Sequence, residues 1–256
     1  RKSFITNQLV QDGVSVDFDL NNLKFSSETL YIYSSAISMK DTILGNYINK
    51  ENVISRPEYL TILSKEKKII GITGTHGKTS TTALLAHIFH YNDIDASYIF
   101  GGMTSFHGIG GHYGDKDEPI ILETDEAYNT FKNIKIDDLL VTNIDIDHLD
   151  YFKKFENLID AFQHVIENVK GNLVLNYDDP NLKELEIKND YVTYSSSEKS
   201  DMIIKYPNTI IKDSKEYKIK TNLLGDHFIS NIAGAICIAN LNGIRTEDAL
   251  KAIETF

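Results

Sequence analysis

The stretch that most constrains the fold of this chain is Lys67 to His90, KKIIGITGTHGKTSTTALLAHIFH. A short apolar strand, a turn with two glycines and an apolar helix follow one another in the order of a P-loop. Gly74 and Gly77 permit a tight turn in which successive N–H groups point at an anion. The strict GxxxxGK[ST] pattern has glycine where this chain has Ile72, so the segment is a variant of the motif. We predict a phosphate-binding strand, loop and helix, against the alternative of an ordinary strand–turn–helix corner.

The polar side chains of this turn suit a polyphosphate bound with Mg²⁺. Lys78 supplies a mobile positive charge, and Thr79 supplies a hydroxyl suited to Mg²⁺. The start of the helix favours a phosphate through its free N–H groups and its dipole. The predicted phosphate-binding residues are Gly74, Thr75, His76, Gly77, Lys78, Thr79 and Ser80.

Three further apolar segments each end in a carboxylate-rich turn: Pro119–Leu122, Leu139–Ile144 and Asn172–Leu175. Fully apolar runs indicate parallel strands covered on both faces, and the carboxyl ends of such strands share one edge of the sheet. The turns can therefore converge on the glycine loop. A glutamate and a histidine there suit a divalent cation, so we predict Glu123 and His148 as metal ligands, against solvated turn residues as the alternative. Asp178 and Asp179 fit either a site or a helix cap before Pro180.

The rest of the chain completes a prediction of fold class and domains. We predict an α/β fold, with a P-loop-type, mostly parallel sheet flanked by helices and a small antiparallel meander, preceded by a partial Rossmann-like domain. The meander comprises residues 202–205, 209–212 and 217–223, and the first domain has strands at 14–18 and 30–33. The predicted domains are 1–64, which binds substrate, and 65–256, which binds nucleotide. Ser34, Ser35 and Ser38 follow a strand end and are candidate substrate-binding residues, with an ordinary polar loop as the alternative.

Composition excludes several classes of partner. A net charge of −11 over 256 residues argues against nucleic acid and against an anionic membrane. The single cysteine, Cys237, excludes an internal disulfide framework and a cysteine-based zinc site. With no apolar run near transmembrane length and no signal peptide, we expect a cytoplasmic location. His107 and His112 lack metal-ligand spacing and are predicted to be loop residues.

Taken together, these motifs resemble the Mur ligase family, which builds the peptide stem of bacterial peptidoglycan. The segments that carry the resemblance are TGTHGKTSTT (73–82), ETDEA (123–127), TNIDIDHLDYF (142–152), LNYDDP (175–180) and GDHFISNIAGA (225–235). The histidine in the glycine loop, the ETDE form and the SSAIS segment at 34–38 are most similar to the alanine-adding branch of the family.

The resemblance implies an ATP-dependent amide ligase that joins L-alanine to UDP-N-acetylmuramate. The substrate carboxylate would take the γ-phosphate of ATP to give an acyl phosphate, from which the amine displaces phosphate. It assigns the catalytic roles to Lys78 on the β- and γ-phosphates and to Glu123 and His148 on Mg²⁺, with Thr79 on the first Mg²⁺. Asn231 matches an adenine contact in the family's H-N-x-x-N-A pattern, where Phe228 replaces the first Asn.

Two parts of the family's pattern have no counterpart here, namely the N-terminal glycine-rich turn and the C-terminal third domain. We therefore expect a part of a longer enzyme that binds Mg-ATP weakly and does not ligate by itself. The alternatives are a ligase that recycles muramyl tripeptide and, from another class, a P-loop nucleotide-binding regulatory module without ligation chemistry.

Overall fold

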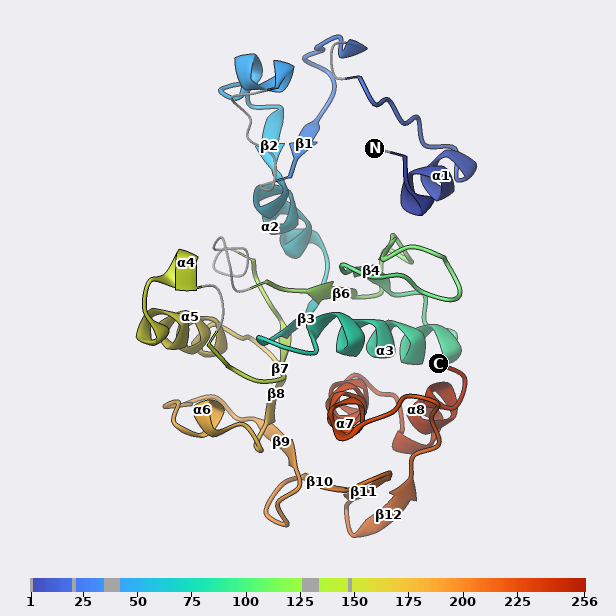
Figure 1. Ribbon diagram of the computed structural model, residues 1–256, viewed down its shortest axis with the longest axis vertical. Helices are drawn as coiled ribbons and strands as arrows, with labels where there is room; N and C mark the ends of the chain where they lie inside the picture. Colours follow the sequence, from blue (N-terminus) through green and yellow to red (C-terminus); the bar gives the residue numbers. More distant parts are fainter. Residues whose placement is uncertain (1, 20–21, 35–41, 126–133, 147–148) are drawn as a thin grey trace. The chain divides into compact units, whose positions relative to one another are not determined.

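The structure is a computed structural model that describes residues 2–19, 22–34, 42–125, 134–146 and 149–256. The chain divides into two compact units, Arg1–Leu63 and Ser64–Phe256. The helices and strands of the two units are drawn in Figure 1. Each unit is described by itself.

The smaller unit contains a two-stranded parallel sheet. Its elements are α1 (Phe4–Gln11), β1 (Tyr31–Tyr33), the 3₁₀ helix η3 (Ile43–Tyr47), β2 (Val53–Ser55) and the start of α2 (Arg56–Glu66). Tyr31 of β1 lies opposite Val53 of β2. The strand predicted at 14–18 is wrong, because those residues form no ladder and Val14 and Phe18 are exposed. Alternating apolar residues make a strand only where a neighbouring strand supplies hydrogen bonds.

The larger unit is built on one ten-stranded sheet in the order β12-β11-β10-β9-β8-β7-β3-β6-β4-β5. Its strands are β3 (Ile69–Thr73), β4 (Ser97–Ile99), β5 (Gly111–His112), β6 (Ile120–Glu123), β7 (Asp138–Val141), β8 (Leu173–Asn176), β9 (Val192–Ser195), β10 (Met202–Lys205), β11 (Thr209–Lys212) and β12 (Lys215–Lys218). All neighbours from β4 to β10 are parallel, and the pairs β10–β11, β11–β12 and β4–β5 are antiparallel. The predicted fold class is confirmed, with the meander continuing the main sheet.

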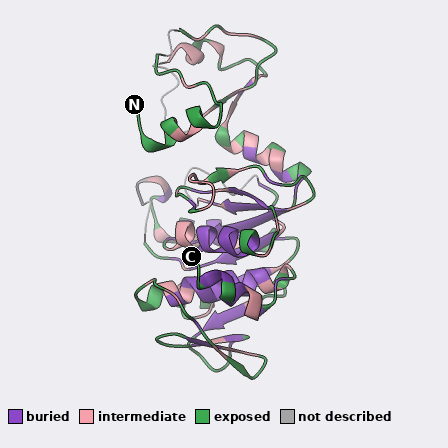
Figure 2. Cartoon of the chain, turned by 90° about the vertical axis from the view of Figure 1, so that its right-hand side faces the viewer, coloured by how far each residue is buried: buried purple, intermediate pink, exposed green. Residues whose placement is uncertain are grey.

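Helices cover both faces of this sheet. They are α3 (Lys78–Tyr91), α4 (Leu149–Phe152), α5 (Phe155–Glu167), α6 (Pro180–Lys183), α7 (Asp226–Leu241) and α8 (Thr246–Ile253). Figure 1 shows α3, α7 and α8 on one side of the sheet and α5 on the other. In Figure 2 the buried residues concentrate in the strands and in the helices packed on them. Gly234 of α7 lets that helix approach β9, since a Cβ there would lie 2.9 Å from the ring of Tyr194.

Strand β3 lies where the direction of the chain reverses across the sheet. From β3 the chain runs to β4 and β6 on one side, then crosses to β7, β8 and β9 on the other. In open α/β sheets ligands bind at the carboxyl ends of the strands beside such a switch point. The topology therefore places the loop after β3 at the favoured position for a ligand.

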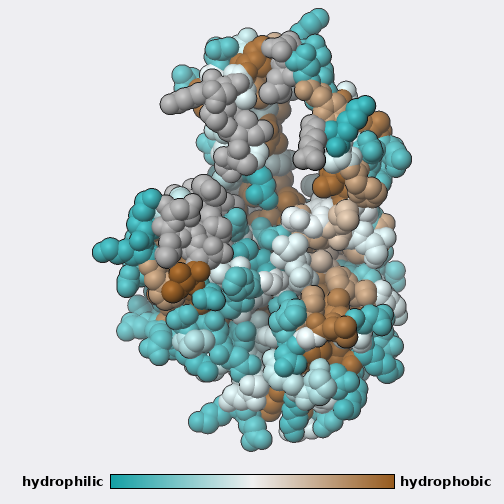
Figure 3. Space-filling view, in the orientation of Figure 1, coloured by the Kyte–Doolittle hydropathy of each residue, from teal (hydrophilic) through white to brown (hydrophobic). Residues whose placement is uncertain are grey.

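The exterior of the larger unit is mostly polar. Hydrophilic side chains predominate on the face drawn in Figure 3, with smaller hydrophobic areas between them. Within the described ranges, no helix has both the length and the apolar character that crossing a membrane requires.

A buried carboxylate, Asp138, lies at the start of β7, at the amino-terminal end of the strand and thus away from the glycine loop. Its side chain is 2% exposed and lies 2.8 Å from the Nζ of Lys68. It also accepts hydrogen bonds from the backbone N–H of Asn172 at 2.8 Å and from the side chain of Asn242 at 2.9 Å. Burial alone would raise the pKa of Asp138, but these hydrogen bonds outweigh it and hold the pKa below its ordinary value.

This arrangement predicts how stability depends on Asp138. We expect Asp138→Ala to lower the free energy of unfolding by about 3 kcal/mol at pH 7, the low end for a broken buried pair because Lys68 is half-exposed. Since the folded-state pKa is depressed, the contribution is present above the unfolded pKa of about 3.9 and is lost as pH falls through the folded-state pKa. Urea unfolding at pH 7 and pH 3 measures both effects, with the exposed Asp160→Ala as control. An equal loss at both pH values would contradict the assignment.

Candidate functional site

The loop between β3 and α3 has the backbone that the glycine pattern predicts. Gly74 and Gly77 have φ angles of +133° and +83°, a region that side chains with a Cβ rarely adopt. A Cβ on Gly74 would lie 2.1 Å from the Oγ1 of Thr142, and a Cβ on Gly77 would lie 2.7 Å from the Oδ1 of Asn231. At both positions only glycine fits.

Asn143, just after β7, holds this loop from the side. Its Oδ1 accepts a hydrogen bond from the N–H of His76 at 2.8 Å, and its Nδ2 donates to the His76 carbonyl at 2.9 Å. Its own carbonyl accepts from the N–H of Thr75 at 3.0 Å, and Thr142 Oγ1 donates to the His76 carbonyl at 2.7 Å. Main-chain and side-chain hydrogen bonds thus continue the ladder between β3 and β7 past the strand ends.

The first turn of α3 carries the predicted cation and hydroxyl groups. Lys78, Thr79 and Ser80 are half-buried, whereas His76 is exposed. The Nζ of Lys78 donates to the carbonyls of Gly74 at 2.5 Å and of Thr75 at 3.3 Å, so its charge lies over the loop. Among the residues the structure describes, no side chain caps the helix at Gly77. The N-terminal N–H groups of α3 and this lysine together suit an anion.

Glu123 lies beside that turn, at the end of β6. Its Oε1 accepts a hydrogen bond from Thr79 Oγ1 at 2.7 Å, and its Oε2 accepts one from the N–H of Gly101 at 2.7 Å. A hydroxyl and a carboxylate oxygen are ligands that Mg²⁺ takes, usually together with water and substrate phosphates. Over the described ranges, no group of three or more His, Cys, Asp or Glu could hold a metal alone. The donor set therefore fits Mg²⁺ delivered with a phosphate.

Asn231 faces the same loop from α7. Asn231 is 8% exposed as a residue, and it lines a pocket of about 300 Å³ next to the glycine loop. The other residues of the pocket are His76, Gly77, Thr142, Asn143, Asn176, His227 and Ser230. Five residues of this lining carry amide or imidazole groups, which can hydrogen-bond the edge of a nucleobase.

The remaining predicted site residues are one serine in the smaller unit and three residues outside the described ranges. Ser34 follows β1 in the smaller unit and is exposed. Ser35, Ser38 and His148 lie outside the described residues. The roles predicted for these four residues stay predictions.

Asp178 and Asp179 both make the contacts of a turn. Asp179 caps α6 by accepting from the N–H of Leu182 at 2.8 Å. Burial raises its pKa above the ordinary value, with hydrogen bonds opposing the rise. Asp178 accepts from the N–H and the hydroxyl of Ser196, each at 2.8 Å. Of the two alternatives given by the sequence, the contacts favour the cap and turn.

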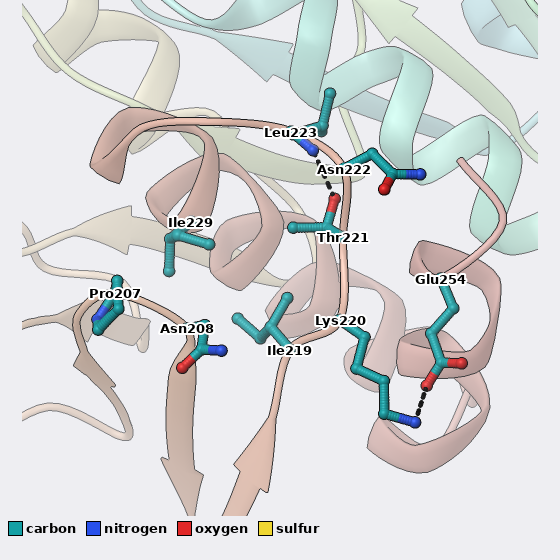
Figure 4. Close-up of a pocket in the computed structure, with 9 residues that line it drawn as sticks. All are labelled: Pro207, Asn208, Ile219, Lys220, Thr221, Asn222, Leu223, Ile229 and Glu254. Carbon is teal, nitrogen blue, oxygen red and sulfur yellow. Dashed lines mark hydrogen bonds and ion pairs between the residues drawn. The ribbon is translucent and has the colours of Figure 1, made fainter.

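A second pocket, of about 420 Å³, lies where the meander meets α7 and α8. Figure 4 shows Lys220 and Glu254 reaching toward each other there, with their charged groups 3.1 Å apart. Its lining consists of Pro207, Asn208, Ile219, Lys220, Thr221, Asn222, Leu223, Ile229 and Glu254. Among the described residues, none that the sequence singled out for the site lines this pocket, so it stands apart from the glycine loop.

Sequence reasoning missed three contributors to the site, namely two amide side chains and one main-chain N–H. Asn143 and Asn176 follow strands just as the predicted carboxylates do, and attention to amides at strand ends would have found them. The Gly101 N–H that contacts Glu123 is a main-chain group, for which a sequence offers only the Gly101-Gly102 pair as a signal.

A glycine loop at the switch point, a lysine over it, and a threonine–glutamate pair beside it define an α/β domain of the P-loop type. Comparison with known families makes the class specific. Residues 72–239 match the Mur ligase middle domain, and the chain belongs to the Mur ligase family.

Individual relatives agree with the family. The UDP-N-acetylmuramate–L-alanine ligase of Dictyoglomus turgidum is 32% identical over 271 residues, a match that covers all of this chain and 58% of that protein. The UDP-N-acetylmuramate–alanine ligase of Thermotoga maritima has a similar structure, with a TM-score of 0.84 and 23% identity over 100% of this chain and 61% of its own.

A ligase of a different specificity has a fold almost as similar. The UDP-N-acetylmuramate:L-alanyl-gamma-D-glutamyl-meso-diaminopimelate ligase of Neisseria meningitides gives a TM-score of 0.82 at 20% identity, over 100% of this chain and 88% of that one. At this level of identity the two structural matches show the fold alone. This chain thus spans about three fifths of the alanine ligases it matches.

Proposed function

We propose that this chain is the nucleotide-binding part of an ATP-dependent amide ligase that joins L-alanine to UDP-N-acetylmuramate in peptidoglycan synthesis. The observation that carries the proposal is the contact of Thr79 with Glu123 beside a glycine loop spanned by Lys78. The relative with 32% identity over the whole chain supports the choice of substrates. As in that family, we propose a cytoplasmic enzyme that uses ATP and Mg²⁺.

In the proposed reaction, a substrate carboxylate attacks the γ-phosphorus of ATP, and ADP leaves with the electrons of the broken bond. The amine of L-alanine then attacks the resulting acyl phosphate and expels inorganic phosphate. The substrate carboxylate and the triphosphate of ATP are both anions and repel each other. Fixed positive charge and oriented N–H groups therefore do most to lower the barrier. Mg²⁺, when bound, would supply part of that charge.

Different residues of this chain would bind the phosphates, the metal ions and the adenine. The loop N–H groups and the start of α3 hold the phosphates, and Lys78 turns from the loop carbonyls toward the β- and γ-oxygens. Thr79 and Glu123 offer oxygen atoms to Mg²⁺, with His148 proposed as the ligand of a second metal ion. Asn231, in the neighbouring pocket, would hydrogen-bond the adenine edge.

A second candidate function is the ligation of a preformed muramyl tripeptide. The observation that favours it is the sequence itself, because such ligases share the GTHGKT and DH motifs of this chain. The fold does not separate the two candidates, since the TM-scores to a ligase of each kind are 0.82 and 0.84. The phosphate chemistry is the same in both, and the two candidates differ only in the amine that attacks.

The test is turnover of the full-length protein with Mg-ATP and UDP-N-acetylmuramate, supplied with L-alanine, glycine, L-serine or the tripeptide L-alanyl-γ-D-glutamyl-meso-diaminopimelate. We expect phosphate release to depend on L-alanine and a product whose mass is that of the amide. Amide formed only with the tripeptide would support the second candidate. Mg-ATP binding with no amide product from any amine would contradict both and favour a regulatory module.

A further inference from the structure

The loop between β4 and β5, residues 100–110, begins directly on the proposed Mg²⁺ ligands. The N–H of Gly101 donates to Glu123 Oε2 at 2.7 Å, while Glu123 Oε1 accepts from Thr79 at 2.7 Å. A Cβ on Gly102 would lie 3.1 Å from the Cγ2 of Thr79. The start of this loop therefore helps to set where the carboxylate of Glu123 points.

The far end of the loop is held by a histidine cluster, which we define as His90, His107 and His112 with Tyr98 and Phe106. The ring of Phe106 stacks on His90 with centroids 4.1 Å apart and an angle of 7°. The Nδ1 of His107 lies 2.7 Å from the hydroxyl of Tyr98, and the rings of His107 and His112 are 4.0 Å apart. The proposed ligase chemistry uses none of these side chains.

Hydrogen bonds across the loop connect its two ends. The N–H of Phe100 donates to the Gly110 carbonyl at 2.8 Å, and the N–H of His107 donates to Thr104 Oγ1 at 3.1 Å. Thr104 Oγ1 is also 3.1 Å from the Tyr98 hydroxyl. These bonds form a continuous connection from His107 through Thr104 and Tyr98 to the strand that leads into Gly101.

The groups that face His107 come from every element packed on it. They are His90 from α3, Tyr98 from β4, His112 from β5 and Asp95 from the turn before β4, whose carboxylate is 2.7 Å from His112. Burial lowers the pKa of His107, and His112 and His90 lower it further, against a smaller opposite effect of Asp95. A proton on His107 would also prevent its Nδ1 from accepting the Tyr98 O–H.

We propose that His107 is a positioning residue that acts through loop 100–110 to hold the Gly101 N–H on Glu123, and that protonation of its ring releases this hold. The proposal rests on the proposed function for the importance of Glu123 as a metal ligand. Neutral His107 keeps the loop on α3, and a charged ring beside two other imidazoles loosens the loop and frees the Glu123 carboxylate to rotate.

The sign of the pH dependence follows from the depressed pKa. The ring is neutral in the folded protein at pH 7.5, so its stabilising contacts are complete above the unfolded pKa of about 6.5. They are lost as pH falls through the folded-state pKa, which lies below 6.5. The hold on Glu123 is therefore expected to weaken on acidification below pH 6.5.

Nuclear magnetic resonance of this chain between pH 7.5 and 4.5, a range that extends well below the ordinary pKa of histidine, tests the coupling directly. We expect the backbone amide resonance of Gly101 to shift with the same midpoint as the ring protons of His107. In His107→Asn, whose side-chain oxygen can still accept from Tyr98, the Gly101 resonance should stay constant over this range. His164→Asn, which removes an exposed histidine on α5, should leave the Gly101 titration as it is in the parent chain.

A second measurement separates this proposal from the proposed function. Mn²⁺ added with ATP at pH 7.5 should broaden the Gly101 resonance. The apparent Mn²⁺ affinity should be about threefold to tenfold weaker below the measured midpoint of His107, and His107→Asn should remove that difference. Absence of broadening with ATP present at pH 7.5 would overturn the metal role of Glu123. A Gly101 resonance that ignores the titration of His107, or a His107 ring that stays neutral down to pH 4.5, would overturn the positioning role whether or not Mn²⁺ binds.

Discussion

Replacing Lys78 with alanine is expected to lower the turnover of the full-length protein about 10²–10³-fold, the usual loss when one fixed group that stabilises a developing charge is removed. Its ammonium group lies over the glycine loop, within hydrogen-bonding distance of two loop carbonyls. In the transition state the β–γ bridging oxygen and the β-phosphate of the leaving ADP carry more negative charge than they do in bound ATP. The loss should therefore fall mainly on kcat, with a smaller effect on KM for ATP.

Steady-state phosphate release with UDP-N-acetylmuramate and L-alanine measures this loss. Lys116→Ala, which removes an exposed lysine from the same unit, is the matched control and should retain the parental kcat. Lys78→Arg keeps the positive charge, but its planar fork differs from a compact ammonium, so we expect only partial recovery. Near-parental turnover of Lys78→Ala would remove the catalytic role that we propose for this loop.

The centre of this site was predictable because its signals are local. The strand, the glycine turn, Lys78 and the helix that starts there are contiguous, so their order fixes the geometry without help from distant residues. The approach of Glu123 to Thr79 was also predictable, since Ile72 and Glu123 are paired in parallel register at the same edge of the sheet.

Contacts in which a side chain or main-chain group replaces an expected partner could not be predicted from the hydrophobic pattern of the sequence. The amide of Asn143 takes the place of a backbone partner for His76, a substitution that no periodicity reports. The Gly101 N–H has no side chain to mark it. The strand predicted at 14–18 was wrong because an alternating pattern does not show whether a partner strand is present.

Substitution of Gly74 by alanine is the most severe backbone test of the same loop. The new Cβ would lie 2.1 Å from Thr142 Oγ1 and 2.9 Å from the Asn143 carbonyl, at a φ of +133°. To make room for this Cβ, the loop would have to break the hydrogen bond of Thr142 to the His76 carbonyl and strain its backbone. We expect a loss of about 3 kcal/mol in the free energy of unfolding, from strain and one or two hydrogen bonds.

We expect Gly74→Ala to weaken nucleotide binding as well as to lower stability. The loop N–H groups must turn away from the phosphate when the backbone yields, so Mg-ATP should bind at least about tenfold more weakly at a temperature where the variant is folded. Titration with a fluorescent ATP analogue and thermal unfolding measure the two effects. Gly111→Ala is the control, because a Cβ there meets nothing within 4 Å and no positive φ constrains it.

The double variant Gly74→Ala/Thr142→Ala separates a steric clash from backbone strain. Removing Oγ1 relieves the 2.1 Å contact but leaves the positive φ and the contacts with Asn143. The double variant should therefore lose less stability than the sum of the two single losses, because neighbouring substitutions that relieve one clash are not additive. Strict additivity would trace the loss to the positive φ and the Asn143 contacts rather than to Thr142. Parental Mg-ATP affinity in Gly74→Ala would mean that the phosphate is not held by this loop.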